Sequence, residues 1–460
     1  MAALRTEAER LEQAMRTLIY PILSISPELT IAIFKACVNQ DPKHGPLALS
    51  HVCSQWRQAA LATPELWTNI QSTMELRVWF GRTGTCLLNA DVTIRSSGDL
   101  ATLEDYLFDH PSRWEMLTLR MEHTAFPRVT RYSLPCFLPC LRGLYVNQGH
   151  MLYPSAEHLE VAPSLMAAYA PCLVELRMKY IAHVLGAQMA IFTYLTTLCI
   201  AGDDAECRAF LNLAPNLQSL TISSPPPEQE GQVVSPLVMS QLRTVIILDG
   251  YPGFLDHLIT PELEHLQFEL DFAVSPVAVK SLVSRSACTR SLRVLDMSVG
   301  EANQDHEFTF ITRFFDLMGT DLANLERLTL REPLENSLDP LFYRMGHPGD
   351  QDAYTAILPA LKSLTLINVG YLAISTVSSM AAMLETRTTD VPEIAKLESF
   401  RFSIEADAWN PIDQATIDDA LTQVRSFRDR GVLDIQVYTA SPRFTNVWEL
   451  RECLNRRCKP

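Results

Sequence analysis

Few side chains in this sequence have the spacing that chemistry requires. His306 is followed by a glutamate, as in a zinc protease, but no second histidine comes one helical turn later. Cys136 and Cys140 flank Phe-Leu-Pro, and Cys453 and Cys458 lie in a basic tail. Neither pair has metal-site spacing, and no second pair completes a tetrahedral set. We therefore expect no metal ligands here and interpret the cysteines as structural.

Motifs for nucleophilic, phosphate-transfer and dinucleotide chemistry are also missing. The sequence has no Gly-x-Ser-x-Gly, no Gly-x-Gly-x-x-Gly and no phosphate loop ending in Gly-Lys-Ser/Thr. Asp203-Asp204 and Asp418-Asp419 are paired carboxylates, but both pairs lie in or near expected helices, where solvated acids are the ordinary explanation. We expect a protein that is not an enzyme and that uses no cofactor.

The composition indicates which classes of partner, and which cellular compartment, to expect. Against 38 Lys and Arg stand 53 Asp and Glu, and the net charge of −15 repels nucleic acid and anionic lipid. No apolar run approaches the roughly 20 residues of a membrane span, and the N-terminus resembles neither a signal nor a transit peptide. The eleven cysteines are scattered beside apolar residues, as buried reduced thiols would be. We expect a cytoplasmic or nuclear protein that contacts no nucleic acid and no membrane.

The first 70 residues read as a helical head. Residues 1–20 form an expected amphipathic helix, with a coiled coil as the alternative. A second helix begins at Ser26, which can cap it, with Pro27 at the first helical position. Further helical segments follow up to residue 70. Three short helices bury little core alone, so we expect exposed apolar positions that serve a partner or the next domain.

The rest of the chain repeats one formula, Leu-x-x-Leu-x-Leu. Eleven copies begin at residues 114, 141, 173, 195, 217, 242, 263, 292, 325, 361 and 397, about 28 residues apart on average. Each copy is an expected strand followed by a return segment, which predicts stacked leucine-rich repeats with a parallel sheet, an α/β solenoid over residues 71–445. An ordinary α/β sheet enzyme is the alternative. A basic tail occupies residues 446–460.

Several return segments and loops can be assigned from the pattern. Helices are expected over residues 203–213, 276–284, 309–318, 374–385 and 413–430. Residues 223–231 and 331–354 are rich in Pro, Gly and acids and are expected to be surface loops. Within the repeats, Leu220, Ile222, Leu328, Leu330, Leu364 and Leu366 are expected to point into a shared core.

Residues 25–70 resemble an F-box of the fungal kind. Val52-Cys53-Ser-Gln-Trp56-Arg57 and Pro64-Glu65-Leu66-Trp67 match the family patterns Val-Cys-x-x-Trp-Arg and Pro-x-Leu-Trp, whereas Ile25-Ser26-Pro27-Glu28-Leu29-Thr30 departs from Leu-Pro-x-Glu-Leu-Leu. The layout of helix, F-box over residues 21–70 and leucine-rich repeats is similar to that of F-box proteins with leucine-rich repeats. The resemblance implies a substrate receptor of an SCF-type ubiquitin ligase.

The resemblance also implies partners and contact residues. The F-box would bind a Skp-type adaptor, and through it a cullin, and the repeats would bind an unknown target protein. The adaptor contacts carried over are Pro27, Leu29, Ile33, Val52, Cys53 and Trp56. For Ile33 and Val52 an internal core position is the alternative. A repeat scaffold that does not deliver its partner for ubiquitination is the alternative function.

Strand alternation suggests where a target would bind. When the last two Leu positions of a motif face the core, the residues beside and between them face solvent. These positions carry Arg120, Tyr145, Arg177 and Lys179 early in the repeats, which we expect to contribute to binding an acidic or phosphorylated target. Simple solvated strand residues are the alternative.

Overall fold

The fold is described by a computed structural model that divides the chain into two compact units, Met1–Ala190 and Ile191–Pro460. The described residues are 5–7, 9–10, 13, 25–41, 45–71, 73–121, 137–148, 170–178, 191–201, 204–222, 235–248, 256–270, 276–299, 310–333, 335–346, 357–369, 374–391, 394–405, 426–427 and 434–440. Within the expected N-terminal helix of residues 1–20, the described residues are helical. Arg10 and Glu7 form an ion pair of 2.8 Å one turn apart there.

The first unit contains a head of short helices. These are α2 (Pro27–Gln40), α3 (Gly45–Val52), α4 (Ser54–Leu61) and the 3-10 helix η2 (Pro64–Trp67). Ser26 caps α2 as expected, because its side chain accepts from the Leu29 amide at 3.4 Å and Pro27 occupies the first turn. The start of α2 is therefore encoded by these residues.

Aromatic side chains form the core of the head. Phe34 of α2 is fully buried, and its ring meets that of Trp56 edge-on at 5.0 Å. Trp67 is also buried, and its Nε1 donates to the Ala60 carbonyl at 2.9 Å. A Cβ at Gly45 would lie 3.1 Å from the Val38 Cα, so the glycine permits α2 and α3 to approach closely. The head therefore has a small core of its own.

A parallel sheet follows the head within the first unit. Its strands run in the order β1 (Asn69–Ile70), β2 (Leu88–Ile94), β3 (Trp114–Met121), β4 (Gly143–Gln148) and β5 (Glu175–Met178). The helices α5 (Thr73–Phe80), α6 (Ser97–Asp109) and η3 (Pro111–Arg113) stand between the first three strands. The sequence placed residues 69–70 at the end of the head, but in the structure they form the first strand of the sheet. The sheet therefore begins before the first recognisable repeat.

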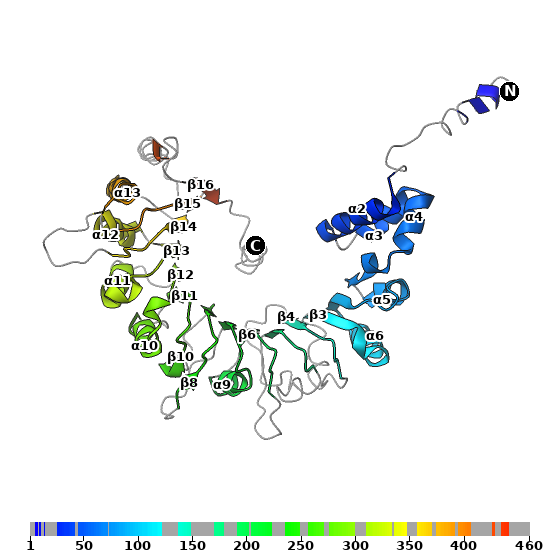
Figure 1. Cartoon of the computed structure of the whole chain (residues 1–460), viewed down its shortest axis with the longest axis horizontal. Helices are drawn as coiled ribbons and strands as arrows, with labels where there is room; N and C mark the ends of the chain where they lie inside the picture. Colours follow the sequence, from blue (N-terminus) through cyan, green and yellow to red (C-terminus); the bar gives the residue numbers. More distant parts are fainter. Residues whose placement is uncertain are drawn as a thin grey trace. The chain divides into compact units, whose positions relative to one another are not determined.

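The second unit continues the strand-and-return pattern. Its strands are β6 (Thr197–Ile200), β7 (Ser219–Ile222), β8 (Leu237–Val238), β9 (Thr244–Ile247), β10 (Leu258–Ile259), β11 (His265–Leu270), β12 (Val294–Val299), β13 (Arg327–Arg331), β14 (Ser363–Val369), β15 (Ser399–Glu405) and β16 (Asp434–Ala440). Its helices are α9 (Asp204–Asn212), α10 (Pro276–Ser286), η5 (Cys288–Arg290), α11 (Phe310–Met318), η7 (Gly319–Leu322), α12 (Glu335–Gly346) and α13 (Ile374–Thr388). β6, β7, β9 and β11 to β16 form one parallel sheet in chain order (Figure 1), and β8 pairs only with β10.

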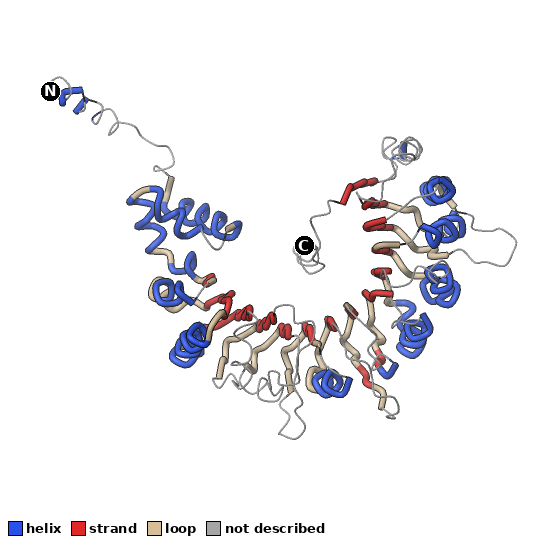
Figure 2. The backbone as a smooth tube through the Cα atoms, turned by 180° about the vertical axis from the view of Figure 1, so that it is seen from behind, coloured by secondary structure: helices blue, strands red, loops and turns tan. Residues whose placement is uncertain are grey.

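Each of the eleven motif copies lies on a strand, so the fold class is mixed α/β with long parallel sheets. In the second unit the helices lie along one side of the strands (Figure 2). The motif side chains expected in the core, from Leu220 and Ile222 to Leu364 and Leu366, are all buried. Strand alternation places the intervening residues on the opposite, open face of the sheet.

The expected return helices are confirmed where the structure describes them. Helices α9, α10, α11 and α13 match the expected ranges to within a few residues. Of residues 413–430 only 426–427 are described, and they are helical. Residues 223–231, Lys179 and the basic tail 446–460 lie outside the described residues.

The loop expected over residues 331–354 is wrong, because it contains helix α12. Pro340 lies inside this helix. Every three or four residues an apolar side chain is completely buried, and these are Leu338, Leu341, Phe342 and Met345. Burial of this stripe outweighs the cost of one proline in the helix. The stripe was present in the sequence, but the turn-forming residues around it obscured it.

The expectation that the cysteines are buried is also wrong for most of those described. All eight described cysteines are free thiols, but only Cys207 and Cys288 are buried, and Cys37 and Cys172 are exposed. Apolar neighbours in sequence do not ensure burial, because consecutive residues of a helix or a turn point in different directions.

Candidate functional site

The head exposes large apolar side chains beside its aromatic core. Leu29 is 60% exposed, Val52 60% and Ile33 40%. Leu29 and Ile33 are one turn apart on α2, on a different face from the buried Phe34 and Val38. The sequence left a core position open for Ile33 and Val52, and in the structure both side chains are exposed. These three exposed residues are together called the head apolar surface, and large exposed apolar side chains are a common feature of interaction sites.

The other residues predicted to contact an adaptor have visible roles inside the head. The Cys53 Sγ accepts a hydrogen bond from the Trp56 amide at 3.4 Å and caps α4. Trp56 is half-buried against Phe34. Pro27 is exposed at the start of α2. The Cys and Trp of this motif therefore build the head, whether or not they also touch a partner.

Two further residues of the motifs, Arg57 and Trp67, likewise make contacts inside the head. Arg57 Nε donates to the Ser50 carbonyl at 2.9 Å and joins α4 to α3. The Trp67 ring meets the Trp79 ring edge-on at 5.3 Å, and the Arg82 guanidinium lies 4.3 Å above Trp67. These contacts fix η2 against α5. Cys53, Trp56, Arg57 and Trp67 thus make contacts within the head, whereas the side chains of the head apolar surface stay exposed.

The open face of the first unit's sheet holds arginines that are paired within the chain. Arg120 donates two hydrogen bonds of 2.7 Å to the Asp91 carboxylate, one to each oxygen. Arg177 donates from Nε and from a terminal nitrogen to the Glu175 carboxylate at 2.9 and 2.7 Å. The Arg120–Asp91 pair is bidentate, the strongest form of this contact, whereas both Arg177 donors reach the same Glu175 oxygen. Arg120 and Arg177, which were expected to meet an acidic target, are therefore paired with acids of the same chain.

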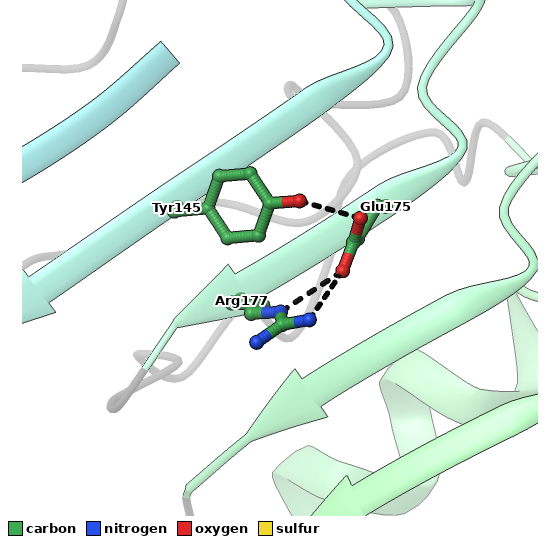
Figure 3. A network of polar contacts seen from close by, with 3 residues as sticks. All are labelled: Tyr145, Glu175 and Arg177. Carbon is green, nitrogen blue, oxygen red and sulfur yellow. Dashed lines mark hydrogen bonds and ion pairs between the residues drawn. The ribbon is translucent and has the colours of Figure 1, made fainter. Parts of the chain in front are cut away.

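Tyr145 completes this arrangement. Its hydroxyl donates to the other Glu175 oxygen, and the Arg177 guanidinium lies 5.1 Å from its ring centre (Figure 3). Burial, together with the hydrogen bond to Glu175, raises the pKa of Tyr145 well above its usual value. Tyr145 consequently remains a neutral donor at any physiological pH. Of the four residues predicted to bind a target, Tyr145 and Arg177 are brought together and Arg120 pairs elsewhere on the face.

The open face of the second unit carries a histidine–aspartate pair. His265 Nε2 on β11 is 3.1 Å from an Asp296 carboxylate oxygen on β12. Burial alone would raise the pKa of Asp296, but hydrogen bonds from His265 and Thr329 and the charge of Arg331 lower it below its usual value. Asp296 is therefore ionised at neutral pH, and its charge is already engaged.

An ion-pair row lines the start of the strands in the second unit. Arg243 lies 3.1 Å from Glu264, Arg293 lies 2.9 Å from Glu326, and Lys362 lies 3.5 Å from the same glutamate. Each of these residues follows the first Leu of its motif, so they lie in a row across the strands. Their charges alternate in sign from one repeat to the next. These side chains are exposed, so each pair contributes little stability.

The described part of the chain contains nothing that resembles a metal centre. No group of three or more His, Cys, Asp or Glu residues there could hold a metal ion. Among the described helices none has both the length and the apolar character to cross a bilayer. The described residues thus present one apolar and two polar surfaces.

A comparison of the sequence with models of protein families found no match, and none of the curated proteins matches it. Function therefore has to be argued from the two kinds of surface, the exposed apolar side chains of the head and the polar open faces of the sheets.

Proposed function

We propose that this chain is the non-catalytic substrate-recognition subunit of an SCF-type cullin-RING ubiquitin ligase. Residues 21–70 act as the F-box and bind a Skp-type adaptor, and through it a cullin. The leucine-rich repeats bind the target protein. In this role the chain works in the cytoplasm or the nucleus and needs neither a cofactor nor a catalytic residue of its own.

The observation that carries the proposal is the head apolar surface beside an F-box-like motif. Leu29, Ile33 and Val52 remain exposed, although the same short helices bury Phe34 and Trp67 completely. Large apolar side chains at an interface commonly supply much of its binding free energy. The long parallel sheets support the second half of the proposal, since stacked repeats present an extended open face to a macromolecule.

The test is co-purification of the tagged full chain with the Skp-type adaptor and the cullin. Val52→Lys places a charge in the head apolar surface, and we expect adaptor capture to fall about tenfold or more. Val78→Lys is the matched control, because Val78 is also a helical valine of the first unit and is 53% exposed. Thermal unfolding of both variants checks that the fold survives.

The outcomes separate the proposal from its alternative. Equal capture of the adaptor by wild type and Val52→Lys contradicts the assigned surface. A wild-type chain that captures other proteins but neither adaptor nor cullin favours the repeat scaffold that does not deliver its partner for ubiquitination. Leu29→Lys, made on α2 instead of α3, provides a second variant at the same surface.

A further inference from the structure

Three arginines of the second unit lie on the open sheet face without a carboxylate partner. Arg327 and Arg331 are on β13, and Arg401 is on β15. Arg327 and Arg401 are exposed, and Arg331 is half-buried. None of the three forms an ion pair with any residue that the structure describes. This set, the β13/β15 arginine face, differs in that respect from Arg120 and Arg177.

The strand register places the three arginines around Thr365. Thr365 on β14 pairs with Thr329 on one side and Arg401 on the other, while Arg327 and Arg331 precede and follow Thr329 by two residues. With strands about 4.8 Å apart and a rise of about 3.3 Å per residue, all three arginine Cα atoms lie within about 8 Å of the Thr365 Cα. Long arginine side chains can converge over such a point.

The open-face positions between the arginines are uncharged, and most of them carry hydroxyl groups. The open-face positions between the arginines are occupied by Thr329, Ser363, Thr365, Ile367, Ser399 and Ser403. Ser363 and Ser399 hydroxyls are 2.7 Å apart. Hydroxyl groups donate to an anion, and small side chains leave room for it.

The described carboxylates near the face form no ion pair with its arginines. Asp296 on β12 is hydrogen-bonded to His265 and Thr329, and it interacts with Arg331 only at longer range. Glu332 follows Arg331 and is exposed, with a positive φ of 51°. In register, Asp434 of β16 lies beside Ser399. Arg331 Nε is shielded from solvent and has no hydrogen-bond partner among the residues that the structure describes. A buried donor without an acceptor is costly, and a bound anion would supply one.

We propose that the β13/β15 arginine face binds the phosphate group of a phosphorylated serine or threonine in a partner protein. A phosphate presents several acceptor oxygens and up to two negative charges, which match planar arginine donors. The chain's net charge of −15 disfavours long polyanions, whereas a single phosphate on a peptide meets only the local cations. The inference rests on the proposed function only in taking a target protein as the source of the phosphate.

The test uses the purified full chain and a degenerate peptide library with one fixed phosphoserine, beside the same library without phosphate. We expect the chain to retain the phosphorylated library preferentially. Arg327→Gln combined with Arg401→Gln should reduce retention about tenfold or more, since hydrogen bonds to charged groups contribute about 1.5–3 kcal/mol each. Inorganic phosphate should compete, and higher salt should weaken binding.

The matched control is Arg243→Gln combined with Arg293→Gln. It removes the same charge from the same unit, but from exposed arginines that are paired with glutamates. Phosphopeptide retention should remain within about twofold of wild type, because exposed ion pairs contribute little. Arg327→Lys combined with Arg401→Lys keeps the charge but loses the planar fork, and should bind at an intermediate level.

Several results would overturn the inference. Equal retention of both libraries, or retention unchanged in the Arg327/Arg401 variant, removes the phosphate site. Stronger capture by phosphatidylserine vesicles that is lost in the same variant makes the face a membrane surface instead. Adaptor co-purification measured on the same proteins keeps the two proposals separate, because it should not change in any of these variants.

Discussion

Arg177 and Arg401 occupy the same place in their repeats but have different surroundings. Both are the fifth residue of a Leu-x-x-Leu-x-Leu copy and project from the open face of a sheet. In the first unit the third residue of the copy is Glu175, which accepts two hydrogen bonds from Arg177. In the second unit the third residue is Ser399, which bonds to Ser363 instead. The third residue of the copy therefore determines whether the arginine at the fifth position has a carboxylate partner within the chain.

The comparison shows that an arginine on the open face of a repeat does not by itself indicate an anion-binding site, because a neighbouring carboxylate can already pair with it. Arg120 is likewise paired with a carboxylate of the same chain, that of Asp91 on the adjacent strand. The early arginines then contribute a rigid, neutral surface with Tyr145, suited to hydrogen bonds and aromatic contact. Among the later arginines, Arg327 and Arg401 form no ion pair with any described residue, and Arg331 interacts with Asp296. That Arg120, Tyr145, Arg177 and Lys179 contact a target remains a prediction, and the anion site is proposed for the second unit instead.

The largest effect should come from an arginine that is satisfied entirely by backbone. Arg387 of α13 is 1% exposed and donates to the carbonyls of Met345, Leu358 and Ile357 at 3.3, 3.0 and 2.6 Å. Burial lowers its pKa to about 10, so it remains charged at neutral pH. Arg387→Met removes every donor, and at about 1–3 kcal/mol per orphaned group it should lower the unfolding free energy by about 3 kcal/mol or more. Denaturant unfolding measures this.

Arg293→Gln is the control for this prediction. Arg293 is exposed and paired with Glu326, and its replacement should cost less than about 1 kcal/mol. Similar losses for both variants would contradict the view that the buried carbonyl contacts make Arg387 structural.

Exchange of the third residue tests the comparison directly. Ser399→Glu places a carboxylate two residues before Arg401, in the relation that Glu175 has to Arg177. We expect phosphopeptide retention to fall about tenfold, because an internal partner competes for the guanidinium. Ser219→Glu is the control, since Ser219 has the same motif position but is followed two residues later by Thr221.

The reciprocal exchange should have the opposite sign. Glu175→Ser releases Arg177 and the Tyr145 hydroxyl, and we expect a weak gain in phosphopeptide retention by the Arg327/Arg401 variant. Unchanged retention after Ser399→Glu would show that the third residue does not control Arg401.

Much of the fold could be predicted because the repeat formula fixes strands independently of their surroundings. The eleven leucine-rich copies identify β3 to β15 apart from the short β8 and β10. The earlier strand β2 was missed, since Ala90 stands where Leu117 and Leu144 stand in the neighbouring strands. Helix α6 was missed too, although Ser96 and Asp99 form a capping box that the sequence displays.

The candidate sites were less accessible from sequence. Alternation correctly gave which residues face away from the core, but pairing depends on which strands become neighbours and in what register. Arg120 meets Asp91 across 29 residues and His265 meets Asp296 across 31. Return segments of varying length hide these relations until the strands are stacked.

The smallest expected effect concerns Asp296, which borders the arginine face. Its lowered pKa means that the unfolded chain binds the proton more tightly than the folded one below neutral pH. The stabilising contribution is therefore complete above the unfolded value of about 3.9 and is lost as the pH falls through the lower folded value. Asp296→Asn should cost about 1 kcal/mol at pH 7, and this cost should shrink on acidification below about pH 4.

The same variant has a second readout on binding. Removing the Asp296 charge leaves Arg331 more available, so phosphopeptide retention should rise modestly although stability falls. Opposite changes in stability and binding are what a carboxylate at the edge of an anion site produces, whereas a purely structural aspartate would lower both or leave binding unchanged. Unfolding measured from pH 3 to pH 7, with retention at pH 7, separates these cases. A cost independent of pH would show that the lowered pKa of Asp296 does not stabilise the fold.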